Sequence, residues 1–171
     1  MISHQSNWSN KRLFELFNII RGVSFPKSAQ SETAGEIIAC LRTKNVQEKV
    51  EFDDLWHVPL RFMRSRDQIV KPHDILISTA NSLNLVGKTA FVTTLPEECT
   101  FGTFIVLLRA QAGYSAKFLY YGMQRREFRQ MVQENASTTT NISNISTEKL
   151  KNLTIPTPSL PEQERIVARI E

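Results

Sequence analysis

The apolar residues of this 171-residue chain occur in short runs, and this pattern limits the fold more than any other feature. The longest apolar runs, 36–41 and 104–108, have the length of a β-strand. A membrane-spanning helix needs roughly 18 to 20 consecutive apolar residues, so we expect no membrane span. With 41% apolar residues, the chain has the composition of a folded globular protein and can bury one sizeable core.

The strand signals gather in the middle of the chain. Residues 74–78 alternate apolar and polar side chains, which is typical of a half-buried strand. Residues 86–94 follow after a polar loop and predict the returning strand, so 74–94 is expected to form a long-looped β-hairpin. The nearly continuous apolar run at 104–109 predicts a fully buried central strand.

Two helices are expected before the C-terminal segment. A short one is predicted over 11–17, ending before Gly22. Ser115 is a candidate N-cap for a second helix that runs from 116 to about 133. Its second half carries Arg125, Arg126 and Arg129. Three arginines there would complement the negative C-terminal end of the helix dipole.

The C-terminal segment begins with Ser146, a candidate cap for a short helix. Three prolines make 155–161 extended. Ser159 and Glu162 then predict a capping box for a final helix. A single apolar stripe on that helix is expected to contact a partner helix, because so short a stripe is not stable alone. The stripe consists of Ile166, Val167 and Ile170.

The net charge of +4 comes from 21 basic and 17 acidic residues that are spread unevenly. Residues 32–54 hold three basic and six acidic groups, a local charge of −3. Residues 56–89 hold five basic and two acidic groups, or +3, and residues 109–131 hold five and one, or +4. Basic stretches of this kind favour a polyanionic partner such as nucleic acid. A solvated basic surface explains the same pattern, so charge alone leaves both interpretations open.

The sequence holds no pattern typical of a catalytic or metal site. Gly87 and Lys88 lack the preceding glycine of a phosphate-binding loop, and no motif of a base methyltransferase or metal-dependent nuclease is present. The histidines at positions 4, 57 and 73 have no metal-ligand spacing with either cysteine. We therefore expect no catalytic residue, no metal ligand and no cofactor in this chain.

The two cysteines, Cys40 and Cys99, are far apart in the sequence. Two reduced thiols in a cytoplasmic protein are the favoured interpretation, and a single disulfide is the alternative. Residues 1–12 lack the apolar core of an export signal, which again favours a cytoplasmic location.

The closing residues, IPTPSLPEQERIVARIE, resemble the junction at which a target recognition domain of a type I restriction-modification specificity subunit passes into its long conserved helix. The matching residues are Pro156, Leu160, Glu162, Gln163, Arg165, Ile166, Val167 and Ile170. Weaker similarities at Trp8 with Leu13, Gly22, 41–46, 74–78, 86–88 and 138–146 extend the resemblance over essentially the whole chain. His73 stands where the family usually has glycine, and Ser159 where a second proline is common. Both departures fall at turn positions and leave the resemblance intact.

This resemblance implies an α/β (mixed α+β) target recognition domain with a twisted, largely antiparallel or mixed sheet flanked by helices. The domain would span 1–158, and 159–171 would begin the spacer and dimerisation helix. The chain would read one half of a bipartite double-stranded DNA target in bacterial defence. Methylation subunits and a restriction subunit would supply the chemistry. The spacer helix would pair with that of a second recognition domain or a second half-subunit.

The candidate DNA contacts are side chains that can neutralise phosphates or read base edges. They are Arg42, Lys44 and Asn45 after a strand; Arg61, Arg64 and Arg66 in a basic aromatic segment; Thr79, Asn81, Ser82, Asn84 and Lys88 around the hairpin loop; and Thr139 and Asn141 in a polar loop. Each group also has an ordinary structural explanation as a solvated basic loop, a hairpin turn or a capping loop.

Two other functions stay open at this point. The chain could be an interaction or scaffold domain that binds no DNA and docks a partner through its C-terminal helix. It could also be a nuclease or a methyltransferase fragment. Salt-dependent DNA affinity separates the first from DNA recognition. Metal-dependent cleavage or S-adenosylmethionine binding would identify an enzyme.

Overall fold

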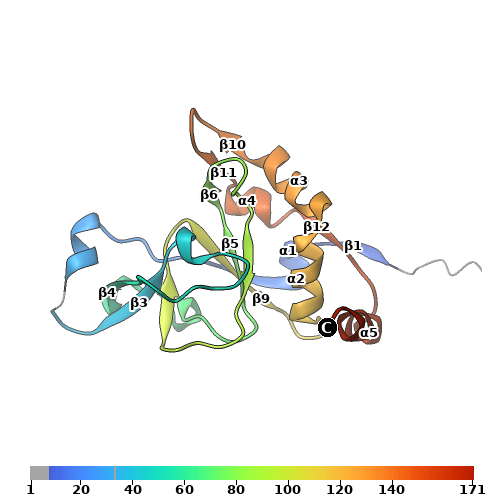
Figure 1. Ribbon diagram of the computed structural model, residues 1–171, viewed down its shortest axis with the longest axis horizontal. Helices are drawn as coiled ribbons and strands as arrows, with labels where there is room; N and C mark the ends of the chain where they lie inside the picture. The colour runs from blue at the N-terminus through green and yellow to red at the C-terminus, as the bar shows by residue number, and fades with distance from the viewer. Residues whose placement is uncertain (1–7, 33) are drawn as a thin grey trace, which may run out of the picture.

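The computed structural model describes residues 8–32 and 34–171 and has a central four-stranded sheet with smaller sheets and helices around it (Figure 1). Residues 1–7, part of the segment without an export signal, lie outside the described residues. The central sheet has the order β2-β9-β5-β7, and all its neighbouring strands are antiparallel. Its strands are β2 (Phe17–Arg21), β5 (Ile75–Ser78), β7 (Thr89–Phe91) and β9 (Ile105–Ala110). The expected mixed fold with a largely antiparallel sheet is confirmed.

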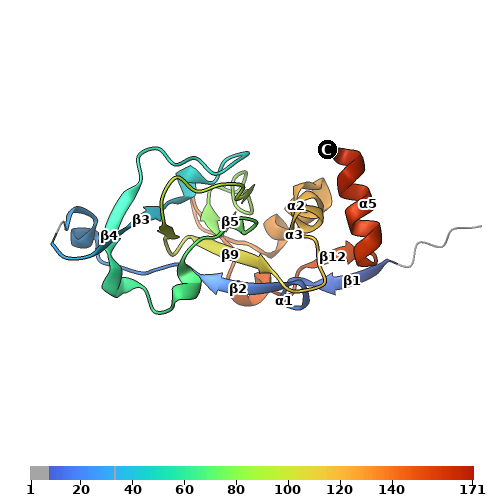
Figure 2. The same ribbon diagram turned by 90° about the horizontal axis from the view of Figure 1, so that it is seen from below.

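Three smaller sheets complete the strand pairing. In one, β3 (Ile37–Leu41) lies between the antiparallel β4 (Trp56–Pro59) and the parallel β8 (Cys99–Phe101). In another, the hairpin of β10 (Ser137–Thr138) and β11 (Ser143–Asn144) adds to β6 (Ala80–Asn81). In the third, β1 (Ser9–Arg12) pairs with β12 (Thr154–Thr157). Figure 2 shows β3 and β4 at the end of the molecule away from the C-terminal helix.

Both faces of the central sheet are covered, so the prediction of a half-buried strand at 74–78 is wrong. Ile75 and Ile77 pack into a core with the helices, whereas Leu76 points to the opposite core beneath β3 and β8. Ser78 is also buried. Ile75, Leu76 and Ile77 are consecutive apolar residues, and they supply both cores because successive side chains on a strand point to opposite sides. The hairpin itself is confirmed, since β5 pairs with β7.

The fully buried strand predicted at 104–109 is only partly correct. Ile105–Leu108 are buried in β9, between β2 and β5. Phe104 lies in the turn before the strand and is 61% exposed. Arg109 is partly exposed and pairs with the buried Asp74. The apolar run therefore includes one side chain that the fold leaves in solvent.

The N-terminal helix is shorter than predicted. Only Leu13–Leu16 form α1, and the chain passes directly into β2. Leu13, Leu16 and Phe17 are buried in the helical core. The dense apolar pattern comes from a single helical turn followed by a strand that pairs with β9 along its whole length.

The predicted helix at 116–133 is two helices, α2 (Ala116–Gln124) and α3 (Arg126–Asn135). Arg125 between them is extended, with φ −67° and ψ 146°. If α2 continued as one helix, its buried face would next fall on polar residues. In α3 the buried residues are instead Phe128 and Val132, so the buried faces of the two helices are not in register. Arg125 is both the C-cap of α2 and the N-cap of α3, whereas Arg126 begins α3 and Arg129 lies in its first half, so only Arg125 of the three arginines lies at a helix C-terminus.

Ser115 and Ser146 cap their helices as predicted. The Ser115 hydroxyl accepts the N–H of Phe118 at 3.3 Å, and the Ser146 hydroxyl accepts that of Lys149 at 3.2 Å at the start of α4 (Thr147–Leu150). The segment predicted to be extended at 155–161 is extended over β12 (Thr154–Thr157), but Leu160 and Pro161 already belong to the C-terminal helix, so the prediction is wrong at its end. Among residues 8–32 and 34–171, no helix has the length and apolar content that a bilayer span requires.

The C-terminal helix α5 (Leu160–Ile170) begins without the predicted capping box. The Ser159 side chain makes no cap hydrogen bond, and Glu162 pairs with Arg165 instead. Ile166 and Val167 pack against the helical core of this same domain, while Ile170 is 54% exposed. Two of the three residues expected to contact a partner helix are therefore already partly buried by their own chain.

Cys40 and Cys99 are free thiols on neighbouring strands, so the expectation of reduced cysteines is confirmed. Burial raises the pKa of each thiol to about 12. Neither thiol is a nucleophile at neutral pH.

His73 has φ 72°, which explains why the family usually has glycine at this position. Left-handed backbone costs a non-glycine residue roughly 1–2 kcal/mol. We expect His73→Gly to raise the free energy of unfolding by about 1 kcal/mol, because the lost stacking of His73 on Phe91 offsets part of the gain. Urea denaturation measures the change. A destabilised variant would show that the ring contact outweighs the backbone strain.

Candidate functional site

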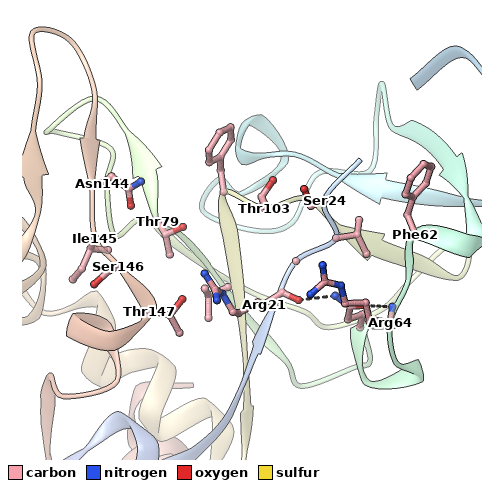
Figure 3. Close-up of a pocket in the computed structure, with 15 residues that line it drawn as sticks. Arg21, Ser24, Phe62, Arg64, Thr79, Thr103, Asn144, Ile145, Ser146 and Thr147 are labelled. Carbon is pink, nitrogen blue, oxygen red and sulfur yellow. Dashed lines mark hydrogen bonds between the residues drawn. The ribbon is translucent and has the colours of Figure 1, made fainter. Parts of the chain in front are cut away.

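A cleft of about 520 Å³ opens where several segments of the chain meet (Figure 3). One wall is formed by the end of β2 and the turns after β4, and it carries Arg21, Ser24, Phe62 and Arg64. The opposite wall runs from the end of β5 to the start of α4, and it carries Thr79, Asn144, Ile145, Ser146 and Thr147. The turn between β8 and β9 contributes Thr103 and Phe104.

Gln68 fixes the two arginines of this cleft relative to each other. Its side chain is nearly buried, and Nε2 donates to the carbonyl of Arg21 at 2.9 Å while Oε1 accepts the N–H of Arg64 at 2.7 Å (Figure 3). The Thr100 hydroxyl in turn donates to the Gln68 carbonyl at 2.8 Å. One side chain therefore joins the backbones of two segments of the chain, so that both arginines start from the same wall of the cleft.

Neither Arg21 nor Arg64 has a carboxylate within ion-pair distance among the described residues. Both side chains are exposed. Uncompensated guanidinium groups beside hydroxyl and amide side chains are suited to phosphate oxygens and to the edge of guanine. The cleft is accordingly the place where the structure best accommodates a polyanion.

A second cleft of about 520 Å³ lies on the other side of the β8–β9 turn and shares Thr103 and Phe104 with the first. The Arg42 guanidinium lies 4.6 Å from the centre of the Trp56 ring and donates to the Asp54 carboxylate at 2.9 Å. Lys44 also contacts Asp54. Lys44, with Arg42 adding to it, lowers the pKa of Asp54, so this acid stays ionised and partly neutralises both cations.

The polar hairpin extends the wall of the first cleft outward. Ser143 lies opposite Asn81, and Asn144 lies opposite Ala80, in the β6–β11 pairing. Asn81 thereby pairs with the residue that precedes Asn144, and of these two asparagines only Asn144 lines the cleft. At the hairpin tip the Thr139 N–H donates to the Ile142 carbonyl at 2.9 Å, and Asn141 is exposed.

Asn45 cannot read a base, because its side chain is fully buried. Its Oδ1 accepts the N–H of Arg42 at 2.8 Å, and its Nδ2 donates to the Asp53 carbonyl at 3.0 Å. The asparagine closes the turn that carries Arg42 and Lys44. The sequence-based assignment of Asn45 as a DNA contact is therefore wrong, while its neighbours stay candidates.

Arg61 and Lys88 are engaged elsewhere. Arg61 donates two hydrogen bonds to the Glu32 carboxylate, at 2.9 and 2.8 Å, and lines neither cleft. This pair lowers the pKa of Glu32. The Lys88 amine donates to Gln47. The structure thus separates Arg61 from Arg64, although they are three residues apart in the sequence.

The remaining candidates, Arg66, Ser82 and Asn84, line neither cleft. Ser82 and Asn84 are exposed in a loop whose backbone carbonyls are hydrogen-bonded. The Asn84 carbonyl accepts a hydrogen bond from the Arg129 guanidinium at 2.7 Å, and the Ser82 carbonyl accepts the N–H groups of Leu85 and Val86. Arg66 is exposed at the start of a single 3₁₀ turn, Arg66–Gln68.

Sequence reasoning missed Arg21, Thr103, Phe104 and Asn144. Asn144 lies in the polar run that supplied Thr139 and Asn141, so that signal was available. Arg21 gives no local signal. It reaches the cleft because Gly22 packs on Gly102, where a Cβ would lie 2.1 Å from the Gly102 carbonyl oxygen. Within the described residues, no cluster of His, Cys, Asp or Glu is suited to hold a metal ion.

Comparison with known proteins gives consistent results. Residues 5–171 match the family described as the type I restriction modification DNA specificity domain. The chain is 31% identical over 160 residues to the EcoKI specificity subunit of Escherichia coli K12, covering 90% of this chain and 33% of that subunit. It is 29% identical over 167 residues to the StySPI specificity subunit of Salmonella potsdam, covering 96% and 35%.

The fold agrees with a solved structure. The S subunit of a type I restriction-modification system from M. genitalium superposes with a TM-score of 0.65 at 18% identity, covering 99% of this chain and 40% of that one. The chain spans about a third of the length of the curated relatives it matches. Those relatives are named specificity subunits, which agrees with the expectation that no catalysis resides here. With nearly all of its residues matched, the chain belongs to the family of type I restriction-modification DNA specificity domains.

Proposed function

We propose that this chain recognises one half of a bipartite double-stranded DNA sequence. The observation that carries the proposal is the cleft in which Arg21 and Arg64, held by Gln68, face Asn144 and Ser146 without a carboxylate partner. Membership of the DNA specificity family supports the same reading. Arginine and asparagine supply both the phosphate contacts that give affinity and the base contacts that give sequence preference.

The assembly around the domain is part of the proposal. Methylation subunits and a restriction subunit carry out the chemistry, and the domain directs them to the site. The spacer helix beginning at 159 joins this domain, 1–158, to a second recognition domain or half-subunit, and the exposed Ile170 is the residue left for that contact. A DNA partner and a role in bacterial defence place the protein in the cytoplasm.

Single and double alanine substitutions at Arg21 and Arg64 test this function. A base-reading arginine should relax one target position at a cost of about 1–3 kcal/mol, whereas a phosphate contact should weaken all sequences equally. Each lost phosphate contact should also reduce the slope of log affinity against log salt by about 0.9. The target is first mapped by genome-wide detection of methylated sites, and binding is then measured on that duplex at several salt concentrations.

Arg125→Ala is the matched control, because it removes the same charge from an exposed arginine that pairs with Glu127 outside both clefts. Its methylated sequence should be unchanged. If exchanging residues 1–155 for those of another specificity domain left the methylated sequence the same, this function would be disproved. A scaffold domain would instead show no salt-dependent DNA affinity in any variant.

A further inference from the structure

Phe104 is the most exposed large apolar side chain among the described residues. It lines both clefts, so it forms a ridge between them. An aromatic ring left in solvent between two clefts that carry basic side chains gains nothing from burial in the free protein. Aromatic side chains are enriched among the residues that a partner covers on binding.

The turn that carries the ring is fixed from three directions. The Phe104 carbonyl accepts the N–H of Thr79 at 2.9 Å. The Gly102 N–H donates to the Leu41 carbonyl at 2.9 Å, and Gly102 packs directly on Gly22. The ring is therefore presented from a rigid backbone, as a specific contact requires.

Cationic groups lie on both sides of this ridge. Arg21 and Arg64 line the first cleft, and Arg42 with Lys44 lines the second. A DNA major groove has the complementary arrangement, with base edges in the middle and a row of phosphates on each side. The C5-methyl group of thymine is the apolar feature among the base edges of that groove.

We propose that Phe104 is a specificity-determining residue that contacts a thymine methyl group in the major groove of the target half-site. The inference rests on the proposed function and adds one base preference to it. The arginines on either side bind phosphates or guanine, and the ring between them makes the apolar contact. Phe104 then favours an A·T pair at one position.

The experiment replaces thymines of the mapped half-site one at a time by deoxyuridine, which removes only the methyl group. Binding is measured with the natural chain that contains these residues, assembled with its methylation subunits. Loss of one buried methyl group should weaken wild-type binding about fourfold at a single position. Phe104→Ala should bind thymine and deoxyuridine equally well there, and should methylate sites with other base pairs at that position. Phe104→Leu should keep part of the preference.

Ile37→Ala is the control, because Ile37 is another exposed apolar residue and lines neither cleft. Three results would overturn the inference. They are wild-type binding that no deoxyuridine substitution weakens, a half-site without an A·T pair, and Phe104→Ala binding that deoxyuridine weakens as much as wild-type binding. A Phe104→Ala variant that keeps its DNA preference but no longer assembles with the methylation subunits would also overturn it. None of these results contradicts the proposed function. A wild-type complex without any DNA sequence preference would disprove both the role of Phe104 and the proposed function.

Discussion

Replacing Asp74 with alanine is expected to lower the free energy of unfolding by about 3–5 kcal/mol. The Asp74 side chain is 2% exposed and accepts two hydrogen bonds from the Arg109 guanidinium, at 2.9 and 2.8 Å. It also accepts the N–H of Lys71 at 2.7 Å. Removing the carboxylate leaves a largely covered guanidinium, itself 20% exposed, without its counter-charge. Urea denaturation of the purified chain measures the loss.

Asp67→Ala is the matched control for this prediction. Asp67 lies 3.9 Å from the same arginine, but its side chain is 72% exposed. An exposed pair contributes little, so the control should lose less than about 1 kcal/mol. Equal losses in the two variants would contradict the idea that burial makes the Asp74–Arg109 pair important.

The strands that the sequence predicted correctly are those with a local signal. The 74–94 hairpin follows from two apolar stretches separated by a polar loop, and β5 pairs with β7 as expected. What the alternation could not reveal is a second core. Leu76 packs beneath β3 and β8, strands that are far from it in the sequence. Both faces of β5 are buried only because distant strands and helices pack on the sheet, so a short segment of the sequence cannot predict it.

The same limit applies to the candidate site. Arg64 could be chosen from a run of basic residues, but Arg61 in that run is neutralised by Glu32, which lies 29 residues away. Arg21 and Phe104 were missed because their exposure depends on how β2 and the β8–β9 turn pack at Gly22. The residue types predicted that the site would be basic and polar. Contacts between residues far apart in the sequence determine which of those side chains line the cleft.

The largest expected effect at the junction with α5 concerns Gln163. Its side chain is only 1% exposed; Oε1 accepts the N–H of Ser115 at 2.9 Å and Nε2 donates to the Pro158 carbonyl at 2.9 Å. The bond to Ser115 ties the first turn of α5 to the N-cap of α2, and the bond to Pro158 ties it to the segment that precedes the helix. Gln163→Ala leaves the buried Pro158 carbonyl and the partly buried Ser115 N–H without these partners, and a buried polar group that loses its partner costs about 1–3 kcal/mol. We expect the free energy of unfolding to fall by about 2–4 kcal/mol, and hydrogen exchange in α5 to accelerate more than in β9.

Gln130→Ala provides the comparison, because Gln130 is an exposed glutamine on α3 whose side chain contacts Glu134. It should change stability by no more than about 0.5 kcal/mol. Gln163→Glu separates the two bonds, since a carboxylate still accepts from Ser115 but cannot donate to Pro158. Exchange in α5 that is unchanged in Gln163→Ala would mean that the packing of Ile166 and Val167 alone sets the direction of this helix. Gln163 would then have no part in aligning the domain with whatever the helix joins.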